Sequence, residues 1–208
     1  MFHQVFRSQN KQKVNKEIIL IGGGGHCKSC IDVIEAEGKY RIAGILDTPE
    51  MHGNKILGYE VIGSDADLPR LIKKFDHFLI TVGQIKSFKK RKQLFEMVKK
   101  AGAKLSTIVS PNAYVAGSAK IEEGTIVMHH AVVNASAAVG KNCIINTKAL
   151  IEHDAIIGNH CHISTASVIN GNVQVGEGVF FGSGAISVQG SIIPDGSFVR
   201  ANSLYYGK

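Results

Sequence analysis

The second half of the chain repeats a hydrophobic pattern every six residues. From Val109 onward, every sixth residue is large and apolar, with Ser187 as the exception. Four positions further along each unit, only Ala, Thr, Cys, Ser or Val occurs. An α-helix with its period of 3.6 would lose this phase, and a strand alternates every two residues. The pattern is typical of hexapeptide solenoids, so it predicts a left-handed parallel β-helix over residues 108–208.

Three such units would form one triangular coil, with about five coils stacked roughly 4.8 Å apart by parallel hydrogen bonds. Residues three units apart then lie one above the other. Cys143 and Cys161 are related in this way at the small inward position, so we expect them to pack in the core rather than bind metal. At the corners, segments such as Gly140-Lys141-Asn142 and Gly158-Asn159 tolerate the φ values that tight turns require.

Residues 17–107 alternate strands and helices instead, which predicts a Rossmann-like α/β domain with a parallel sheet of at most about four strands. Ser64 is expected to cap a helix. The expected strands are Glu17–Ile21, Arg41–Leu46 and His77–Val82, and the expected helices are Cys27–Glu37, Asp65–Phe75 and Phe88–Ala101.

A glycine-rich loop from Gly22 to Gly25, followed by His26, joins the first strand to the first helix. Backbone N–H groups at such a helix N-terminus suit a phosphate. Asp47, at the end of the next strand, is placed to accept hydrogen bonds from a ribose or a uracil ring. Cys27 replaces the third glycine of the G-x-G-x-x-G pattern, which disfavours a dinucleotide site and an NAD-linked oxidoreductase. A tight turn without a ligand is the structural alternative.

The formal net charge of +7, with lysines clustered at Lys73–Lys74, Lys86–Lys92 and Lys99–Lys100, favours anionic partners such as coenzyme A or nucleotide sugars. Nucleic-acid binding rests on charge alone and is not expected. No apolar run reaches the roughly 18 residues that span a bilayer, so no membrane insertion is expected. Residues 1–16 are basic without the apolar core of a signal peptide, which predicts a mobile leader and a cytoplasmic protein.

His153 is the strongest candidate for chemistry. It lies two places after Ile151, so we expect it at a corner, pointing out of the prism between Glu152 and Asp154. A neighbouring carboxylate holds the imidazole tautomer and stabilises its protonated form, as a general base requires. One coil later, the N–H of Gly171 is placed to face an oxyanion beside the imidazole.

Other histidines and cysteines give weaker signals. His162 is half a coil from His153 and is not expected to be its neighbour in one subunit. None of the nine histidines shows a zinc-site spacing, so no metal is expected. Cys27 and Cys30 form a C-x-x-C at the start of a helix, where packing is favoured over a redox or zinc role.

Three segments resemble bacterial sugar O/N-acetyltransferases of the sialic-acid O-acetyltransferase and bacillosamine N-acetyltransferase type. They are IGGGGHCKS at Ile21–Ser29, INTKALIEHDAIIGNHCHIS at Ile145–Ser164 and NGNVQVGEGVFFGSGA at Asn170–Ala185, and the resemblance covers nearly the whole chain after Lys16. It implies a homotrimer with active sites between neighbouring solenoids. It also implies acetyl-CoA as donor and a nucleotide sugar or sialic acid as acceptor.

The resemblance also implies roles for individual residues. His153 would be the base, Asp154 would assist it, and the N–H of Gly171 would serve the oxyanion. Asn146 would lie by the acceptor sugar, and His162 and Gly182 would bind acetyl-CoA. The nucleotide site would be lined by Gly22, Gly25, His26, Asp47, Gly83 and Arg91.

The leading hypothesis is therefore an acetyl-CoA-dependent acetyltransferase that N-acetylates a UDP-4-amino-sugar by direct attack, since no cysteine is placed to form a covalent intermediate. O-acetylation of sialic acid is the alternative within this class, because Asn170-Gly171-Asn172 resembles that branch. A non-catalytic trimeric binding or scaffold protein is the alternative of another class. Its best support is that the G-x-P-A-K-like tail usual in the family has no counterpart in this sequence.

Overall fold

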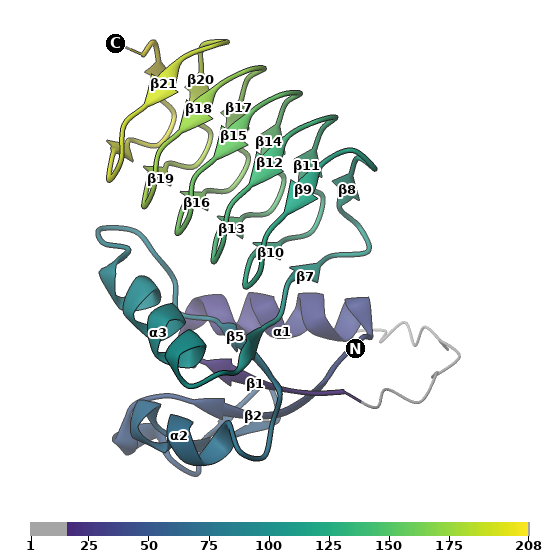
Figure 1. The fold of residues 1–208 in the computed structure, drawn as a ribbon, viewed down its shortest axis with the longest axis vertical. Helices are drawn as coiled ribbons and strands as arrows, with labels where there is room; N and C mark the ends of the chain where they lie inside the picture. Colours follow the sequence, from purple (N-terminus) through teal and green to yellow (C-terminus); the bar gives the residue numbers. More distant parts are fainter. Residues whose placement is uncertain (1–15, 208) are drawn as a thin grey trace, which may run out of the picture.

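The computed structural model describes residues 16–207, and it confirms both predicted fold classes. An α/β domain lies beneath a stack of triangular coils, a left-handed parallel β-helix (Figure 1). The leader predicted over residues 1–16 lies, apart from Lys16, outside the described residues. Within residues 16–207, no helix has both the length and the apolar character that a membrane crossing needs.

The α/β domain is built on one sheet with strand order β3-β4-β2-β1-β5-β6. The prediction of at most about four strands was wrong, since the sheet has six. Two of the missed strands have two residues each and are too short to show a period in the sequence. The strands are β1 (Glu17–Ile21), β2 (Arg41–Leu46), β3 (Lys55–Ile56), β4 (Tyr59–Gly63), β5 (His77–Ile80) and β6 (Lys104–Leu105), all paired in parallel except β3 with β4.

The helices of this domain are α1 (Gly25–Glu37), α2 (Leu68–Leu71) and α3 (Lys89–Lys100), with 3-10 turns at Pro49–Met51 and Asp65–Asp67. The first and third agree with the prediction within two residues. The helix predicted over Asp65–Phe75 is much shorter. Ser64 is the N-cap of the 3-10 turn Asp65–Asp67 that precedes α2, and its N–H donates to the Asp67 carboxylate at 2.9 Å. Beyond Leu71 the chain tightens into turns that bury Phe75 just before β5.

The β-helix has three faces, each a parallel sheet of two-residue strands. Face 1 contains β7 (Ile108–Val109), β10 (Ile126–Val127), β13 (Ile144–Ile145), β16 (His162–Ile163), β19 (Phe180–Phe181) and β22 (Phe198–Val199). Face 2 contains β8 (Tyr114–Val115), β11 (Val132–Val133), β14 (Leu150–Ile151), β17 (Val168–Ile169), β20 (Ile186–Ser187) and β23 (Leu204–Tyr205). Face 3 contains β9 (Lys120–Ile121), β12 (Ala138–Val139), β15 (Ile156–Ile157), β18 (Gln174–Val175) and β21 (Ile192–Ile193).

The coil length and the inward residues agree with the six-residue pattern. Ile144 pairs with His162, and every other strand pair of the β-helix has this same offset of three units. Cys143 and Cys161 stack in the core, where the Cys161 N–H donates to the Cys143 Sγ at 3.4 Å. The exceptional Ser187 is also buried, and its hydroxyl accepts the Asn170 N–H at 3.0 Å. The hydrogen bond offsets the cost of burying that hydroxyl.

Glycine occurs at some corners of the β-helix for a different reason from the one predicted. Asn142 does adopt a positive φ of 54°, as the turn argument predicts. Gly140 and Gly158 do not, so the prediction was wrong for them. A Cβ on Gly158 would lie 2.7 Å from the backbone of Gly176, and a Cβ on Gly140 would lie 2.8 Å from the backbone of Gly158. These glycines are required because successive coils approach one another closely.

The two domains share a continuous core. The outward residues Ile108, Ile126 and Ile144 on face 1 are buried in one cluster with Ile31 and Ile34 of α1. This burial holds the α/β domain against the lower part of face 1 (Figure 1).

We expect Gly158→Ala to destabilise the protein by about 1–3 kcal/mol, because the added methyl group overpacks a backbone contact. Gly117→Ala is the matched control, since a Cβ at Gly117 meets nothing within 4 Å. Thermal unfolding of both variants checks this. An unchanged midpoint for Gly158→Ala, or an equal loss in both, would contradict the stacking explanation.

Candidate active site

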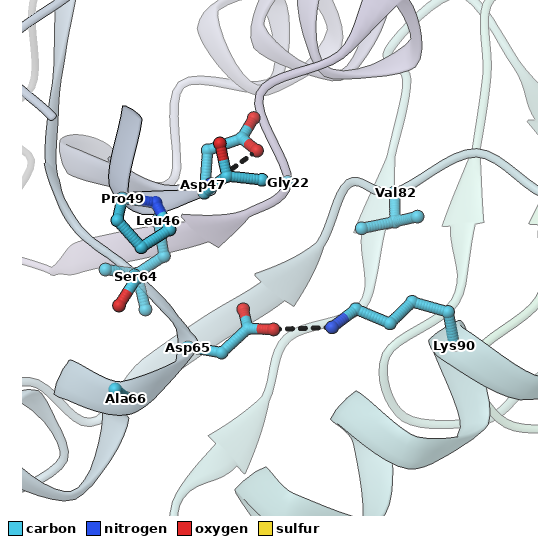
Figure 2. Close-up of a pocket in the computed structure, with 10 residues that line it drawn as sticks. Gly22, Leu46, Asp47, Pro49, Ser64, Asp65, Ala66, Val82 and Lys90 are labelled. Atoms are coloured by element: carbon cyan, nitrogen blue, oxygen red, sulfur yellow. Dashed lines mark hydrogen bonds and ion pairs between the residues drawn. The ribbon is translucent and has the colours of Figure 1, made fainter. Parts of the chain in front are cut away.

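A cavity of about 270 Å³ opens at the carboxyl edge of the α/β sheet (Figure 2). The segments that follow β1, β2, β4 and β5 converge there, as the carboxyl ends of parallel strands do in ligand-binding α/β sheets. Its lining residues are Gly22, Leu46, Asp47, Thr48, Pro49, Ser64, Asp65, Ala66, Val82 and Lys90. Sequence reasoning found Gly22 and Asp47 but missed the others.

Asp47 organises the glycine loop. Its carboxylate accepts the Gly23 N–H at 2.6 Å and the Thr48 N–H at 2.7 Å. A carboxylate has further lone pairs, so Asp47 retains capacity for a ligand hydroxyl. Space is open around Gly24 and Gly25 at the N-terminus of α1, because a Cβ on either would meet nothing within 4 Å. Unpaired N–H groups of a first helical turn in open space can receive an anion.

An ion pair crosses the rim of the cavity. Lys90 at the start of α3 lies 2.6 Å from the Asp65 carboxylate, and Figure 2 shows the two side chains reaching toward each other. Other lysines of the same helix pair with carboxylates of the β-helix, as Lys92 does with Glu177 at 2.7 Å. Part of the positive charge seen in the sequence is therefore compensated within the chain.

A buried polar cluster lies where the α/β domain meets face 1. The His162 Nδ1 lies 2.5 Å from the carbonyl oxygen of Gln84, and its Nε2 lies 3.0 Å from the Asn146 amide nitrogen. Burial lowers the pKa of His162 to about 4. His26 lies nearby with Gly83 against its Cβ, and burial, with the charge of Arg91, lowers its pKa to about 3. Among residues 16–207, the buried His26 Nε2 finds no partner.

Gln84 belongs to this cluster and was missed from the sequence. It is buried, and its side chain donates to the His160 carbonyl oxygen at 2.9 Å. The only available signal was its position just after the strand β5, at the edge of the sheet where ligands bind.

Two residues assigned to binding by resemblance serve packing here. The buried guanidinium of Arg91 donates to the carbonyl oxygens of Ile80 and Val82 at 2.8 and 2.7 Å and to the Asn142 side chain at 2.8 Å. It does not line the cavity, because these interior acceptors hold it between the domains. Gly182 is needed for coil stacking, since its Cβ would lie 2.5 Å from the Ala201 nitrogen.

His153 lies at the corner between β14 on face 2 and β15 on face 3. Its Nδ1 lies 2.8 Å from the Asp154 carboxylate, so Nδ1 carries a hydrogen, and in the neutral form of the imidazole Nε2 then carries the lone pair. Glu152 does not contact the ring. It accepts the His153 backbone N–H and the Asn134 amide instead.

Gly171 stacks over the His153 ring, as the coil length predicts. A Cβ on Gly171 would lie 2.8 Å from both Cε1 and Nε2 of the imidazole, so any side chain there would collide with it. The Gly171 N–H has no acceptor among the described residues. A free N–H beside an unprotonated imidazole nitrogen can hold a developing oxyanion while the imidazole removes a proton.

One chain does not bring all predicted site residues together. Asn146 follows β13 and lies at the corner between faces 1 and 2, whereas His153 lies at the corner between faces 2 and 3. The full width of face 2 separates them. Within one chain, His26, Asn146 and His162 therefore lie in one group, and His153, Asp154 and Gly171 lie in another.

The cysteines and the acidic groups show no sign of redox or metal chemistry. Burial raises the pKa of the Cys27 thiol to about 11 and raises that of Cys30 further, which makes both poor nucleophiles. Over residues 16–207, no group of three His, Cys, Asp or Glu side chains is arranged to hold a metal ion.

Comparisons with known proteins agree with the architecture of an α/β domain followed by a β-helix. A family model described as the PglD N-terminal domain matches residues 17–98. A search of curated proteins gave no match. Among solved structures, the acetyltransferase domain of PglB from Neisseria gonorrhoeae is 30% identical with a TM-score of 0.85, covering 93% of each chain.

Two ligand complexes are also similar. PerB from Caulobacter crescentus, solved with CoA and GDP-perosamine, is 31% identical with a TM-score of 0.86, covering 93% of this chain and 90% of that one. The PglB domain with acetyl coenzyme A is 31% identical with a TM-score of 0.83, covering 90% and 89%.

We expect His26 and His162 to remain uncharged from about pH 8 to about pH 5. An unperturbed histidine, with a pKa near 6.5, would become protonated within this range. Because their pKa values are lowered, the unfolded state binds more protons below about pH 6.5, and stability falls as the pH drops from there toward 4. Imidazole NMR shifts recorded over this range measure both sites. A midpoint near 6.5 for either histidine would show that it is not shielded by the domain junction.

Proposed function

Because the chain belongs to the hexapeptide-repeat family of sugar N-acetyltransferases that includes PglB and PerB, we propose that it acetylates the amine of a nucleotide-linked amino sugar with acetyl-CoA. The enzyme class is acyltransferase. The main support for the proposal is the hydrogen-bonded pair of His153 and Asp154, with the backbone of Gly171 stacked over the His153 ring. That pair and the free N–H supply a base and an oxyanion donor at one corner.

The reaction needs no covalent enzyme intermediate. The neutral amine of the sugar attacks the thioester carbonyl of acetyl-CoA and forms the new C–N bond, while His153 Nε2 takes the proton that the amine loses. The Gly171 N–H donates to the oxyanion of the tetrahedral intermediate. As the C–S bond breaks, the thiolate of CoA leaves and receives the proton from His153. Asp154 stabilises the imidazolium between these two steps.

The acceptor is proposed to carry a nucleoside diphosphate, most simply as a UDP-4-amino-sugar. The open N-terminus of α1 suits the diphosphate, and the cavity beside Asp47 suits the ribose and base. The complex of PerB with GDP-perosamine supports a nucleotide sugar as the acceptor class. O-acetylation of free sialic acid would leave both features unused, and so would a scaffold role.

We propose that the working form is a homotrimer in which face 2 of each β-helix is turned toward the threefold axis. The outward residues of that face are all apolar, and several are exposed, including Tyr114 at 60% and Ile186 at 42%. Face 3 is mixed, because its outward positions include Lys120 and Gln174 as well as the exposed Ile156 and Ile192. A column of exposed apolar side chains indicates a protein interface. With face 2 inward, the corner with His153 in one copy meets the corner with Asn146 in the next.

We also propose a cytoplasmic location for the reaction. Acetyl-CoA is a cytoplasmic metabolite, and the four cysteines are all buried free thiols, the state that a reducing compartment maintains.

We expect His153→Asn to lower kcat/KM by about 10²–10⁴-fold, the usual contribution of a general base. The assay is CoA release from acetyl-CoA with UDP- and GDP-linked 4-amino sugars, with free sialic acid as the competing acceptor. His130→Asn is the matched control, because His130 is an exposed corner residue whose positive φ asparagine tolerates. Equal turnover by His153→Asn and the wild type would rule out the assigned base. If only sialic acid were acetylated, the acceptor would be sialic acid and not a nucleotide-linked amino sugar.

A further inference from the structure

A chain of hydrogen bonds runs from the α/β domain to the acceptor corner of the β-helix. It starts at the main-chain carbonyl of Gln84, passes through the His162 ring and ends at the side-chain amide of Asn146. The Asn146 oxygen is held separately by the Thr147 N–H at 2.8 Å. Both ring nitrogens of His162 and the side-chain oxygen of Asn146 therefore have partners.

The first link fixes the direction of the others. A carbonyl oxygen only accepts, so His162 Nδ1 must carry the hydrogen at the 2.5 Å contact with Gln84. In a neutral imidazole Nε2 is then an acceptor, and only the NH₂ group of Asn146 can face it. One N–H of that group is used by His162. The second N–H has no acceptor among residues 16–207, and Asn146 is half-exposed at the corner.

The surroundings keep His162 in this single state. Its exposed fraction is 7%, and its ring packs edge-on against Phe180 with 5.3 Å between centroids. Arg91 and His26 are the other titratable groups that act on this region, and the positive charge of Arg91 opposes a second proton on the ring. A protonated His162 would turn a donor toward the Asn146 N–H and break the chain.

We infer that His162 is a positioning residue that fixes the Asn146 amide so that its free N–H donates to an oxygen of the acceptor sugar. The inference rests on the proposed function and sharpens it. It replaces the coenzyme role that resemblance gives to His162, because both ring nitrogens are already bonded within the chain. Asn146 thereby selects a sugar that presents a lone pair, such as a hydroxyl oxygen, near the reacting amine.

Two variants of His162 separate this role from simple packing. His162→Phe keeps an aromatic ring against Phe180 but offers Asn146 no acceptor. His162→Gln restores a side chain that can both donate and accept. We expect His162→Phe to raise KM for the amino-sugar nucleotide about fivefold to tenfold, the value of roughly one neutral hydrogen bond. KM for acetyl-CoA should change little, and His162→Gln should recover most of the loss.

A double-mutant cycle with Asn146→Ala is the decisive comparison. If His162 acts only through Asn146, His162→Phe has no further effect on acceptor KM in the Asn146→Ala background. A rise in KM for acetyl-CoA, or an undiminished loss in that background, would overturn the positioning role.

The ¹⁵N shifts of His162 give a readout that does not depend on activity. We expect a neutral ring protonated at Nδ1, and we expect the Asn146 amide proton that bonds His162 to lose its downfield hydrogen-bonded shift in His162→Phe. A ring protonated at Nε2 would overturn the inference even in an active enzyme. Absent turnover with every amino-sugar nucleotide would refute the proposed function, and the NMR result would still decide the hydrogen-bond chain.

Discussion

The parallel hydrogen-bond ladder between successive coils is the constraint on which the rest of this structure depends. Each strand of the β-helix pairs with the strand one full turn later, in the same register from the first coil to the last. This places Gly171 over His153 and stacks Cys161 on Cys143. It also leaves no room for a side chain at Gly158 or Gly182. The ladder thus holds His153 and Gly171, the proposed base and oxyanion donor, in a fixed relation without help from a loop, and electrostatic catalysis requires such preorganisation.

Much of this was predictable because the determinants are local and periodic. The six-residue repeat defines the β-helix and its coil length, and the coil length alone relates Gly171 to His153. Short strands and helices without a repeating sequence pattern were not predicted correctly. The strand Lys55–Ile56 has two residues, and the helix after Ser64 ends at Leu71 because the chain turns to bury Phe75. Corner glycines were assigned to turn geometry, whereas the cause at Gly158 is a contact with the next coil, which only the three-dimensional stack reveals.

The contacts between the two domains could not be predicted from the sequence either, because they too depend on the three-dimensional arrangement. Arg91 and Gln84 lie in segments far from their partners in the β-helix, and nothing in the local pattern distinguishes a buried arginine from the neighbouring surface lysines. In the structure, Arg91 bridges the end of β5 and the Asn142 corner, and Gln84 holds His162. The domain junction thus holds the α/β domain against face 1 and, through His162, orients the side-chain amide of Asn146, which we propose faces the acceptor.

We propose that the site is assembled from two copies of the chain, with His153 from a corner of one copy and Asn146 from a corner of the next. The most direct measurement uses two inactive chains, His153→Asn and Asn146→Ala, each with a different affinity tag. They are co-expressed, and trimers that carry both tags are purified and assayed with acetyl-CoA and the amino-sugar nucleotide. We expect mixed trimers to regain substantial activity, because some interfaces combine an intact His153 with an intact Asn146. Mixed trimers as inactive as either parent would show that both residues act within one chain.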